Sequence, residues 1–202
     1  MKPYYESGGI TIYHGDSRGW LPDADVLVTD PPYGMGYRSG WSGAMVAGDD
    51  DVATRDAVLA LWGARPALVF GRWNLPRPPM TRVRLVWDKG EWPGMGDLSF
   101  PWGPSDEEIY VLGDGWIGKR EGTVLRCNRI GGNGQHPTEK PIPVLERLLR
   151  HAPLGSILDP FMGSGTTLLA AKNLCRRAIG IEIEERYCEI AARRLDQEVL
   201  AL

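Results

Sequence analysis

The residues that most clearly suggest chemistry follow the apolar run Val26–Thr29. Prolines cannot extend a β-ladder, so Pro31 and Pro32 end this strand and form a rigid turn after Asp30. The Asp30 carboxylate and the Pro31 carbonyl can accept hydrogen bonds from the exocyclic amino group of adenine or cytosine, which localises its lone pair, and Tyr33 can stack on the base. The segment predicts activation of a base amino group, and a base in a duplex must first be flipped out. The alternative is an ordinary strand end with Tyr33 packed on the core.

A glycine-rich turn forms the second candidate site. The segment 156–168 is typical of a strand, a tight turn around Gly163 and Gly165, and a helix, which lets a ligand approach the backbone closely. The next strand ends at Glu182, about 20 positions after the first turn glycine, where a carboxylate can hold ribose hydroxyls. Together these features predict an adenosine-containing ligand, against the alternative of a turn that only joins a strand to a helix.

The residues around the turn narrow the choice of ligand. A P-loop needs a lysine before Thr166, and a dinucleotide turn needs a small residue where Leu168 stands. Met162 occupies the first glycine position of a serine-hydrolase elbow and excludes that motif. Asp159, at the strand end, would repel a pyrophosphate and suits a cationic ligand with an amino-acid tail, such as S-adenosylmethionine.

Three segments together resemble the permuted (β-class) amino-methylating DNA methyltransferases. They are Asp30-Pro-Pro-Tyr33, His136-Pro-Thr-Glu-Lys-Pro141 and Asp159-Pro-Phe-Met-Gly-Ser-Gly-Thr-Thr167, with the catalytic segment before the cofactor turn. The resemblance covers nearly the whole chain. It implies an α/β, Rossmann-like methyltransferase fold with a seven-stranded mixed sheet, a circularly permuted motif order and S-adenosylmethionine bound across the strand ends.

The resemblance also implies roles for individual residues. It assigns Asp30, Pro31, Pro32 and Tyr33 to catalysis. The residues that it assigns to the cofactor are Asp16, His136, Thr138, Lys140, Phe161, Gly163, Gly165, Thr166 and Glu182. Asp159, whose carboxylate suits a cationic ligand, is also expected to contact the cofactor. Among these, His136, Thr138 and Lys140 are expected at the methionine end of the cofactor. The segments 72–74 and 87–89 resemble those around the target-base pocket. No second histidine or cysteine stands near His136 at ligand spacing, so no metal is expected.

Short aliphatic runs alternate with helical patterns, as in an α/β sheet that can position these groups. The expected strands are Ile10–His14, Val26–Thr29, Ala67–Phe70, Val83–Trp87, Glu108–Leu112, Ser156–Leu158 and Ala178–Ile183. The expected helices cover 51–62, 143–151, 166–177 and 184–200. With 202 residues, we expect a single methyltransferase domain over 1–202.

The net charge of −3 does not by itself predict a nucleic-acid binder, but the charge is unevenly spread. The stretches 65–89 and 115–140 are basic, and 90–114 is acidic. The expected DNA contacts are Arg72, Lys89, Lys119, Arg120, Arg126 and Arg129. We therefore expect weak, salt-sensitive binding to double-stranded DNA.

Only 113–135 is available for a target-recognition segment between the strand at 108–112 and His136. Members of the family that the chain resembles usually carry a larger insert there. The short segment predicts a brief recognition sequence, weak specificity, or recognition completed by a second subunit in a homodimer.

Three scattered cysteines without a Cys-x-x-Cys pair indicate neither a disulfide framework nor a zinc knuckle. Residues 1–9 lack the apolar core of a signal peptide, and no apolar run approaches the length of a membrane span. These features favour a cytoplasmic protein with no membrane partner.

The leading hypothesis is a DNA adenine-N6 methyltransferase, because the family resemblance with Asp30 in the first motif position favours adenine. Cytosine-N4 methylation is the close alternative. Less favoured are an RNA methyltransferase, a protein methylase (where asparagine is usual in place of Asp30) and a module that binds S-adenosylmethionine or DNA without catalysis.

Overall fold

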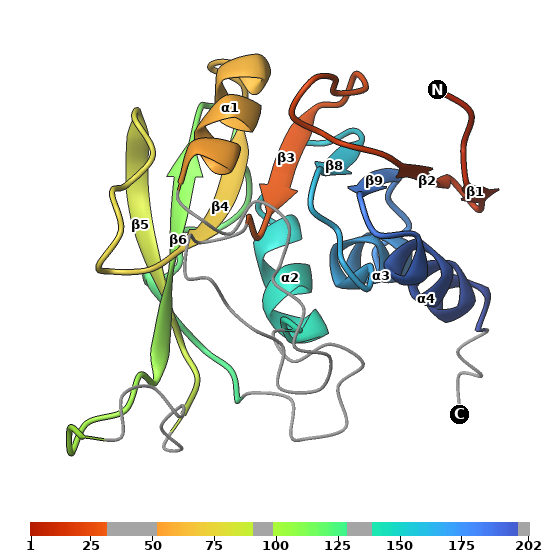
Figure 1. Cartoon of the computed structure of the whole chain (residues 1–202). Coiled ribbons are helices and arrows are strands. Elements are labelled where there is room, and N and C mark those ends of the chain that lie inside the picture. The colour runs from red at the N-terminus through yellow and green to blue at the C-terminus, as the bar shows by residue number, and fades with distance from the viewer. Residues whose placement is uncertain (32–51, 91–98, 129–138, 198–202) are drawn as a thin grey trace.

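The computed structural model describes residues 1–31, 52–90, 99–128 and 139–197 (Figure 1). In these ranges one nine-stranded mixed sheet has the order β1-β2-β9-β8-β3-β4-β6-β5-β7. The strands are β1 (Tyr5–Ser7), β2 (Ile10–His14), β3 (Val26–Thr29), β4 (Ala67–Gly71), β5 (Thr81–Asp88), β6 (Asp106–Leu112), β7 (Val124–Arg126), β8 (Ile157–Asp159) and β9 (Ala178–Glu182). The helices are α1 (Ala53–Trp62), α2 (Ile142–Leu149), α3 (Thr166–Asn173) and α4 (Glu185–Asp196).

Strand direction decides where the functional residues meet. β2, β9, β8, β3 and β4 are parallel neighbours, so their carboxyl ends lie at one edge of the sheet, which we call the carboxyl edge. β6 is antiparallel to both β4 and β5, so its first residues lie at this same edge. The loops after five strands and the start of a sixth therefore converge there.

The seven-stranded sheet expected from the sequence is corrected to nine strands in the described residues. Each of the seven expected ranges overlaps an observed strand, and the additional strands are β1 and β7. Both have three residues and lie at the two outer ends of the sheet, where most of their side chains stay accessible to solvent. A short edge strand buries few side chains and therefore leaves no hydrophobic pattern in the sequence.

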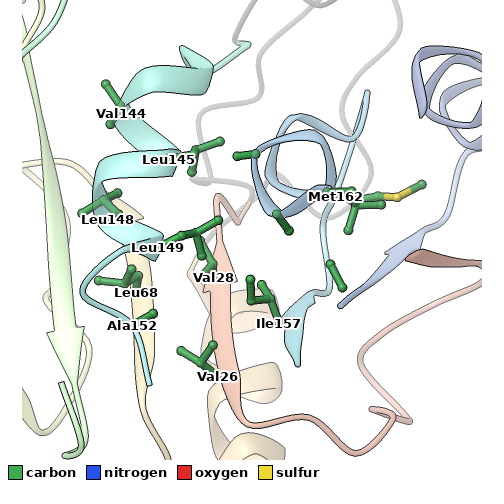
Figure 2. Close-up of a cluster of buried hydrophobic side chains, with 14 of the residues drawn as sticks. Val26, Val28, Leu68, Val144, Leu145, Leu148, Leu149, Ala152, Ile157 and Met162 are labelled. Atoms are coloured by element: carbon green, nitrogen blue, oxygen red, sulfur yellow. The ribbon is translucent and has the colours of Figure 1, made fainter. Parts of the chain in front are cut away.

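Apolar side chains cover both faces of the central strands, as expected for parallel strands between layers of helices. On one face α2, α3 and α4 pack on the sheet, and on the other α1 packs through Trp62. β3 contributes to both layers, because Val26 and Val28 face α2 while Leu27 joins the cluster of Trp62. Figure 2 shows the first layer, with these side chains labelled: Val26, Val28, Leu68, Val144, Leu145, Leu148, Leu149, Ala152, Ile157 and Met162.

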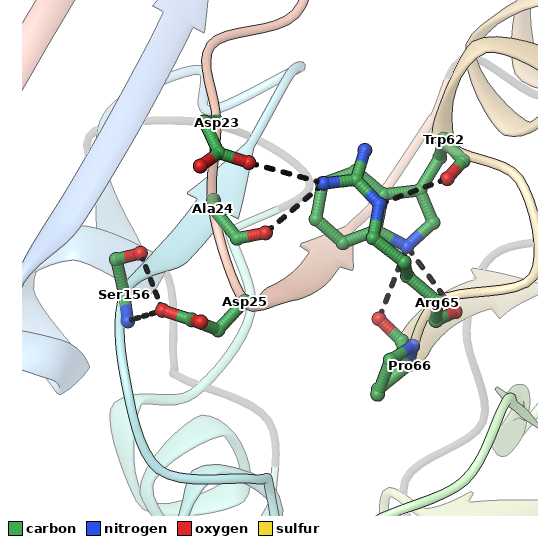
Figure 3. A network of polar contacts seen from close by, with 7 residues as sticks. All are labelled: Asp23, Ala24, Asp25, Trp62, Arg65, Pro66 and Ser156. Carbon is green, nitrogen blue, oxygen red and sulfur yellow. Dashed lines mark hydrogen bonds and ion pairs between the residues drawn. The ribbon is translucent and has the colours of Figure 1, made fainter.

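A polar network fixes the starts of β3, β4 and β8 at the opposite edge (Figure 3). Asp25 Oδ2 accepts hydrogen bonds from Ser156 N at 2.6 Å and from Ser156 Oγ at 2.8 Å. Arg65 stacks on the Trp62 ring, with 3.6 Å between its Cζ and the ring centroid, and donates to Ala24 O at 3.1 Å. Arg65, which belongs to the basic stretch 65–89, thus has a structural role here.

The helices lie close to their expected ranges, but α3 ends at Asn173 rather than at 177. Cys175 has a φ of 53°, a left-handed conformation that stops an α-helix. No helix in the described ranges has both the length and the apolar character needed to cross a membrane.

Candidate active site

A row of carboxylates follows four adjacent strands at the carboxyl edge. Asp16 follows β2, Glu182 ends β9, Asp159 ends β8 and Asp30 follows β3, in the order in which these strands pair. Each of these four residues was predicted from the sequence to belong to the site, and the topology brings them to neighbouring positions. Arg18 pairs with Asp16 and Lys140 pairs with Asp30 at the two ends of the row, so Glu182 and Asp159 in its middle are the carboxylates best placed for a cationic ligand.

Asp159 is the most deeply buried member of this row, with 3% of its surface exposed. Its Oδ1 accepts a hydrogen bond from Phe161 N at 3.1 Å. Burial raises the pKa of Asp159 to about 7, and the neighbouring carboxylates of Asp30 and Glu182 add to the rise. A positive charge placed beside Asp159 would therefore stabilise its ionised form.

The glycine turn connects β8 to α3 and touches Glu182. Gly163 and Gly165 have φ values of 51° and 81°, a region that side chains disfavour. Gly163 N donates to Glu182 Oε2 at 3.0 Å, and Glu184 N donates to Glu182 Oε1 at 2.8 Å. Burial raises the pKa of Glu182, while these backbone donors oppose the rise. The turn and the predicted ribose carboxylate are thus in direct contact.

A cleft opens between the ends of β2 and β9 and the start of the glycine turn. Three predicted cofactor residues, Asp16, Phe161 and Glu182, line it. Asp16 Oδ1 accepts from Arg18 Nε at 3.0 Å, and the hydrogen bonds from Arg18 lower the pKa of Asp16. The other lining residues are Gly15, Ser17, Arg18, Thr54, Pro160 and Ile183. The cleft therefore brings two of the predicted cofactor carboxylates, Asp16 and Glu182, to one opening at the carboxyl edge.

Glu139 and Lys140 join this turn to the rest of the site. Arg194 of α4 lies 2.5 Å from Glu139 Oε1 and donates to Ser164 O at 2.8 Å. Thr166 Oγ1 donates to Glu139 Oε1 at 3.3 Å. Glu139 and Arg194 were not predicted from the sequence, because nothing in their spacing indicates that α4 contacts the residue before Lys140.

Whereas Glu139 contacts the glycine turn, the Lys140 side chain reaches the end of β3. Its side chain is 7% exposed, and Nζ lies 2.5 Å from Asp30 Oδ2 and 3.1 Å from Glu107 Oε2. Burial alone would lower the pKa of Lys140, but Asp30 and Glu107 raise it above its usual value. The sequence placed Lys140 at the methionine end of the cofactor; the structure places its ammonium against Asp30.

Glu107, near the start of β6, was not selected from the sequence, where it is one member of an acidic stretch. Its Oε1 lies 2.6 Å from Lys89 Nζ, and the Lys89 side chain is 10% exposed. Lys89, a predicted DNA contact, is thus enclosed at the carboxyl edge with its ammonium on Glu107.

The other predicted DNA contacts separate into two groups. Arg72 follows β4 and Arg126 ends β7, so both lie at the carboxyl edge. Arg126 Nε lies 3.4 Å from Asp88 Oδ2. Lys119 and Arg120 are exposed in the segment after β6, which begins at the opposite edge, where Leu112 pairs with Ala67 at the start of β4. Ile117 N in this segment donates to His151 O beyond the end of α2. Five predicted site residues lie outside the described ranges: Pro32, Tyr33, Arg129, His136 and Thr138.

A family model described as DNA methylase, of the N6/N4 methyltransferase type, matches residues 82–193. The chain is 31% identical over 189 residues to YubD of Escherichia coli K12, described as a methylase, covering 85% of this chain and 81% of YubD. It is 26% identical over 264 residues to the type II methyltransferase M.ScaI of Streptomyces caespitosus, covering 100% of this chain and 86% of M.ScaI.

Solved structures of similar fold include the cytosine-N4-specific PvuII DNA methyltransferase. It has a TM-score of 0.74 and 16% identity, and the match covers 99% of this chain and 91% of that chain. The complex of M1.HpyAVI with SAM has a TM-score of 0.63 and 22% identity, and the match covers 92% of this chain and 99% of that chain.

Proposed function

Because the chain belongs to the DNA methylase family, we propose that it transfers a methyl group from S-adenosylmethionine to the N6 amino group of adenine in DNA. One observation carries this proposal. Asp30, which can receive the amino group of a base, follows β3, and the glycine turn follows β8, the strand paired directly with β3. The order of these segments along the chain supports assignment to the permuted class.

The residues at the carboxyl edge fit S-adenosylmethionine. This cofactor carries a sulfonium and an ammonium group, and it supplies an electrophilic methyl group. Glu182 and Asp159, in the middle of the row between the ion-paired Asp16 and Asp30, suit that positive charge. We assign Asp159 to the ammonium end, Glu182 to the ribose and Asp16 to the adenine side of the cleft. The solved complex of M1.HpyAVI with SAM supports this choice of ligand.

Further cofactor contacts are assigned from the resemblance. Phe161, Gly163, Gly165 and Thr166 would provide the wall and backbone of the turn, and Lys140, His136 and Thr138 would complete the methionine end. In this arrangement the Thr166 hydroxyl is also engaged by Glu139, which fixes the first turn of α3.

The catalytic groups would act on the amino nitrogen of a flipped adenine. The Asp30 carboxylate and the Pro31 carbonyl accept its two N–H groups and localise its lone pair for attack on the methyl carbon. Tyr33, with Pro32 fixing the turn, would stack on the base. The C–S bond would break as the N–C bond forms, its electron pair would stay on sulfur in the product S-adenosylhomocysteine, and the amino group would pass one proton to water.

Adenine is preferred over cytosine because Asp30 stands in the first position of its motif, which in the resembled family favours adenine. Cytosine-N4 methylation is the second candidate, and the likeness to the cytosine-N4-specific PvuII enzyme favours it. Nucleoside mass spectrometry of DNA treated with the protein and S-adenosylmethionine separates the two. A product containing N4-methylcytosine and no N6-methyladenine would overturn the proposal.

We propose double-stranded DNA as the substrate and 1–202 as one methyltransferase domain. The short segment 113–135 makes a homodimer the natural means of completing sequence recognition. Methylation of RNA but not of duplex DNA would replace this proposal with the RNA alternative. Cofactor binding without any transfer would identify a binding module.

A further inference from the structure

Glu107 lies between two lysines at the carboxyl edge. Its side chain is 18% exposed, and its oxygens lie 2.6 Å from Lys89 Nζ and 3.1 Å from Lys140 Nζ. A carboxylate in such a position is costly unless charged partners compensate for its lost hydration. Burial would raise the pKa of Glu107, but the two lysines outweigh it and hold the pKa below its usual value. Glu107 is therefore ionised at neutral pH.

The contacts of Lys140 extend this arrangement to Asp30. They form a chain of alternating charges, Lys89–Glu107–Lys140–Asp30, that we call the charge chain. Its members come from the ends of β5 and β3, from β6 and from the segment before α2. These parts are far apart in sequence, and the antiparallel direction of β6 brings Glu107 to the edge where the other three lie.

An aromatic ring and two carboxylates of the described residues surround the Lys140 ammonium. The Phe70 ring of β4 lies beneath the ammonium, 5.2 Å from ring centroid to Nζ, and has no group that accepts a directed hydrogen bond in its plane. Glu107 and Asp30 hold Nζ from the ends of β6 and β3. Removing the Glu107 charge would leave Lys140 and Lys89 without the carboxylate that separates them.

We infer that Glu107 is a positioning residue for methyl transfer, which holds the Lys140 ammonium against Oδ2 of Asp30 and thereby fixes the orientation of the carboxylate that receives the base amino group. This inference rests on the proposed function. Glu107 does not itself contact the reacting atoms; it acts through Lys140.

Glu108 provides a matched control, because it is the next residue on the same strand and faces the other side of the sheet. It is 2% exposed, lies 2.8 Å from Arg84 Nη1 and accepts a hydrogen bond from the Tyr110 hydroxyl. Glu108→Gln thus removes a buried, ion-paired carboxylate of the same type without touching the charge chain.

The test compares Glu107→Gln, Glu108→Gln, Lys140→Gln and the double variant Glu107→Gln/Lys140→Gln. Single-turnover methyl transfer is measured at saturating DNA and S-adenosylmethionine over a range of pH, with thermal melting for each variant. Glu107→Gln is expected to lower the rate about 10- to 100-fold, the range of a misplaced catalytic group. The double variant should lose no more than Lys140→Gln alone, since Glu107 acts through Lys140.

The pH profile gives a readout that a purely structural role would not move. In the described part of the chain, the charged groups that face Lys140 include Asp30 after β3, Glu107 of β6 and, beyond Glu107, Lys89 after β5. Without Glu107, the Lys140 ammonium loses one stabilising anion, so the fall in rate at high pH should begin at a lower pH in Glu107→Gln.

Activity of the unaltered protein in this assay tests the proposed function separately, and only the ratios between variants test Glu107. The inference is overturned if Glu107→Gln keeps the rate and pH profile of the unaltered protein, if Glu108→Gln loses as much, or if the losses multiply in the double variant. Should Glu107→Gln fail to fold, Glu107→Asp keeps the charge but shortens the reach. An intermediate rate in Glu107→Asp would then support the inference, and an unaltered rate would overturn it.

Discussion

The ammonium of Lys140 lies 2.5 Å from Oδ2 of Asp30, although 110 positions separate the two residues in the chain. This pair joins the segment proposed to activate the base to the segment that precedes α2. Glu139, the residue before Lys140, contacts Arg194 of α4 and Thr166 at the glycine turn. Two consecutive residues thus connect the proposed base site with the proposed cofactor site.

Binding of S-adenosylmethionine should strengthen as the pH rises from about 6 to 8. The pKa of Asp159 is raised to about 7, so the free protein carries a largely neutral carboxyl at low pH and a carboxylate at high pH. A cationic ligand binds the carboxylate better. Calorimetric titration across this range should show the increase in affinity, and Asp159→Asn should flatten it. An affinity that is independent of pH in the unaltered protein would contradict the role assigned to Asp159.

The free protein should lose stability as the pH rises toward and through 7. The pKa of Asp159 is raised on folding, so its stabilising contribution is fully present below its unfolded value and is lost as pH passes its folded value. The melting temperature without ligand should therefore fall more between pH 5 and pH 8 in the unaltered protein than in Asp159→Asn. Equal slopes for both proteins would show that Asp159 does not titrate in this window.

Gly165→Ala should weaken both stability and cofactor binding. The residue has a φ of 81°, and an added Cβ would lie 2.8 Å from the Cβ of Ala191 on α4. We expect a loss of about 1–3 kcal/mol in the free energy of unfolding from strain and overlap. Gly122→Ala is the control, because no described residue apart from its chain neighbours has an atom within 4 Å of its added Cβ. Denaturant unfolding measures the stability of the two variants, and calorimetric titration measures their affinity for S-adenosylmethionine. Equal losses of stability in Gly165→Ala and Gly122→Ala would argue against the packing of the turn on α4.

Arg194→Ala should be strongly destabilising, whereas Arg193→Ala should not. The Arg194 and Glu139 side chains are 13% and 6% exposed, so removing the arginine should cost about 3 kcal/mol in the free energy of unfolding. Arg193 pairs with Glu189 on the open surface of α4, at 75% and 55% exposure. Pairs of that kind contribute little. Similar melting temperatures for the two variants would contradict this assignment.

Much of the sheet was predictable, because β3, β4 and β9 are buried aliphatic runs with glycine or proline nearby. The site was predictable where one short segment carries it, as in the glycine turn followed by Glu182. The charge chain was not, since Glu107 and Lys140 meet only because β6 runs antiparallel to its neighbours. Sequence spacing also gave no sign that Lys119 and Arg120 lie away from the carboxyl edge. Their position depends on the direction in which β6 leaves the site.

Arg126→Ala should weaken DNA binding more than Lys119→Ala. The Arg126 side chain is 86% exposed at the carboxyl edge, and Lys119 lies in the segment that begins at the opposite edge after β6. Loss of one phosphate contact should lower the slope of log affinity against log salt by about 1. Titration of labelled duplex DNA at several salt concentrations gives this slope. A larger effect of Lys119→Ala would place DNA along the segment 113–135 instead.

Methylation of adenine through Asp30 can be measured by mass spectrometry of nucleosides from duplex DNA, incubated with S-adenosylmethionine and either the unaltered protein or Asp30→Ala. We predict N6-methyladenine with the unaltered protein and at least about a 100-fold loss with Asp30→Ala, while Asp30→Ala still binds the cofactor. Absence of N6-methyladenine with the unaltered protein, or undiminished methylation by Asp30→Ala, would contradict this prediction.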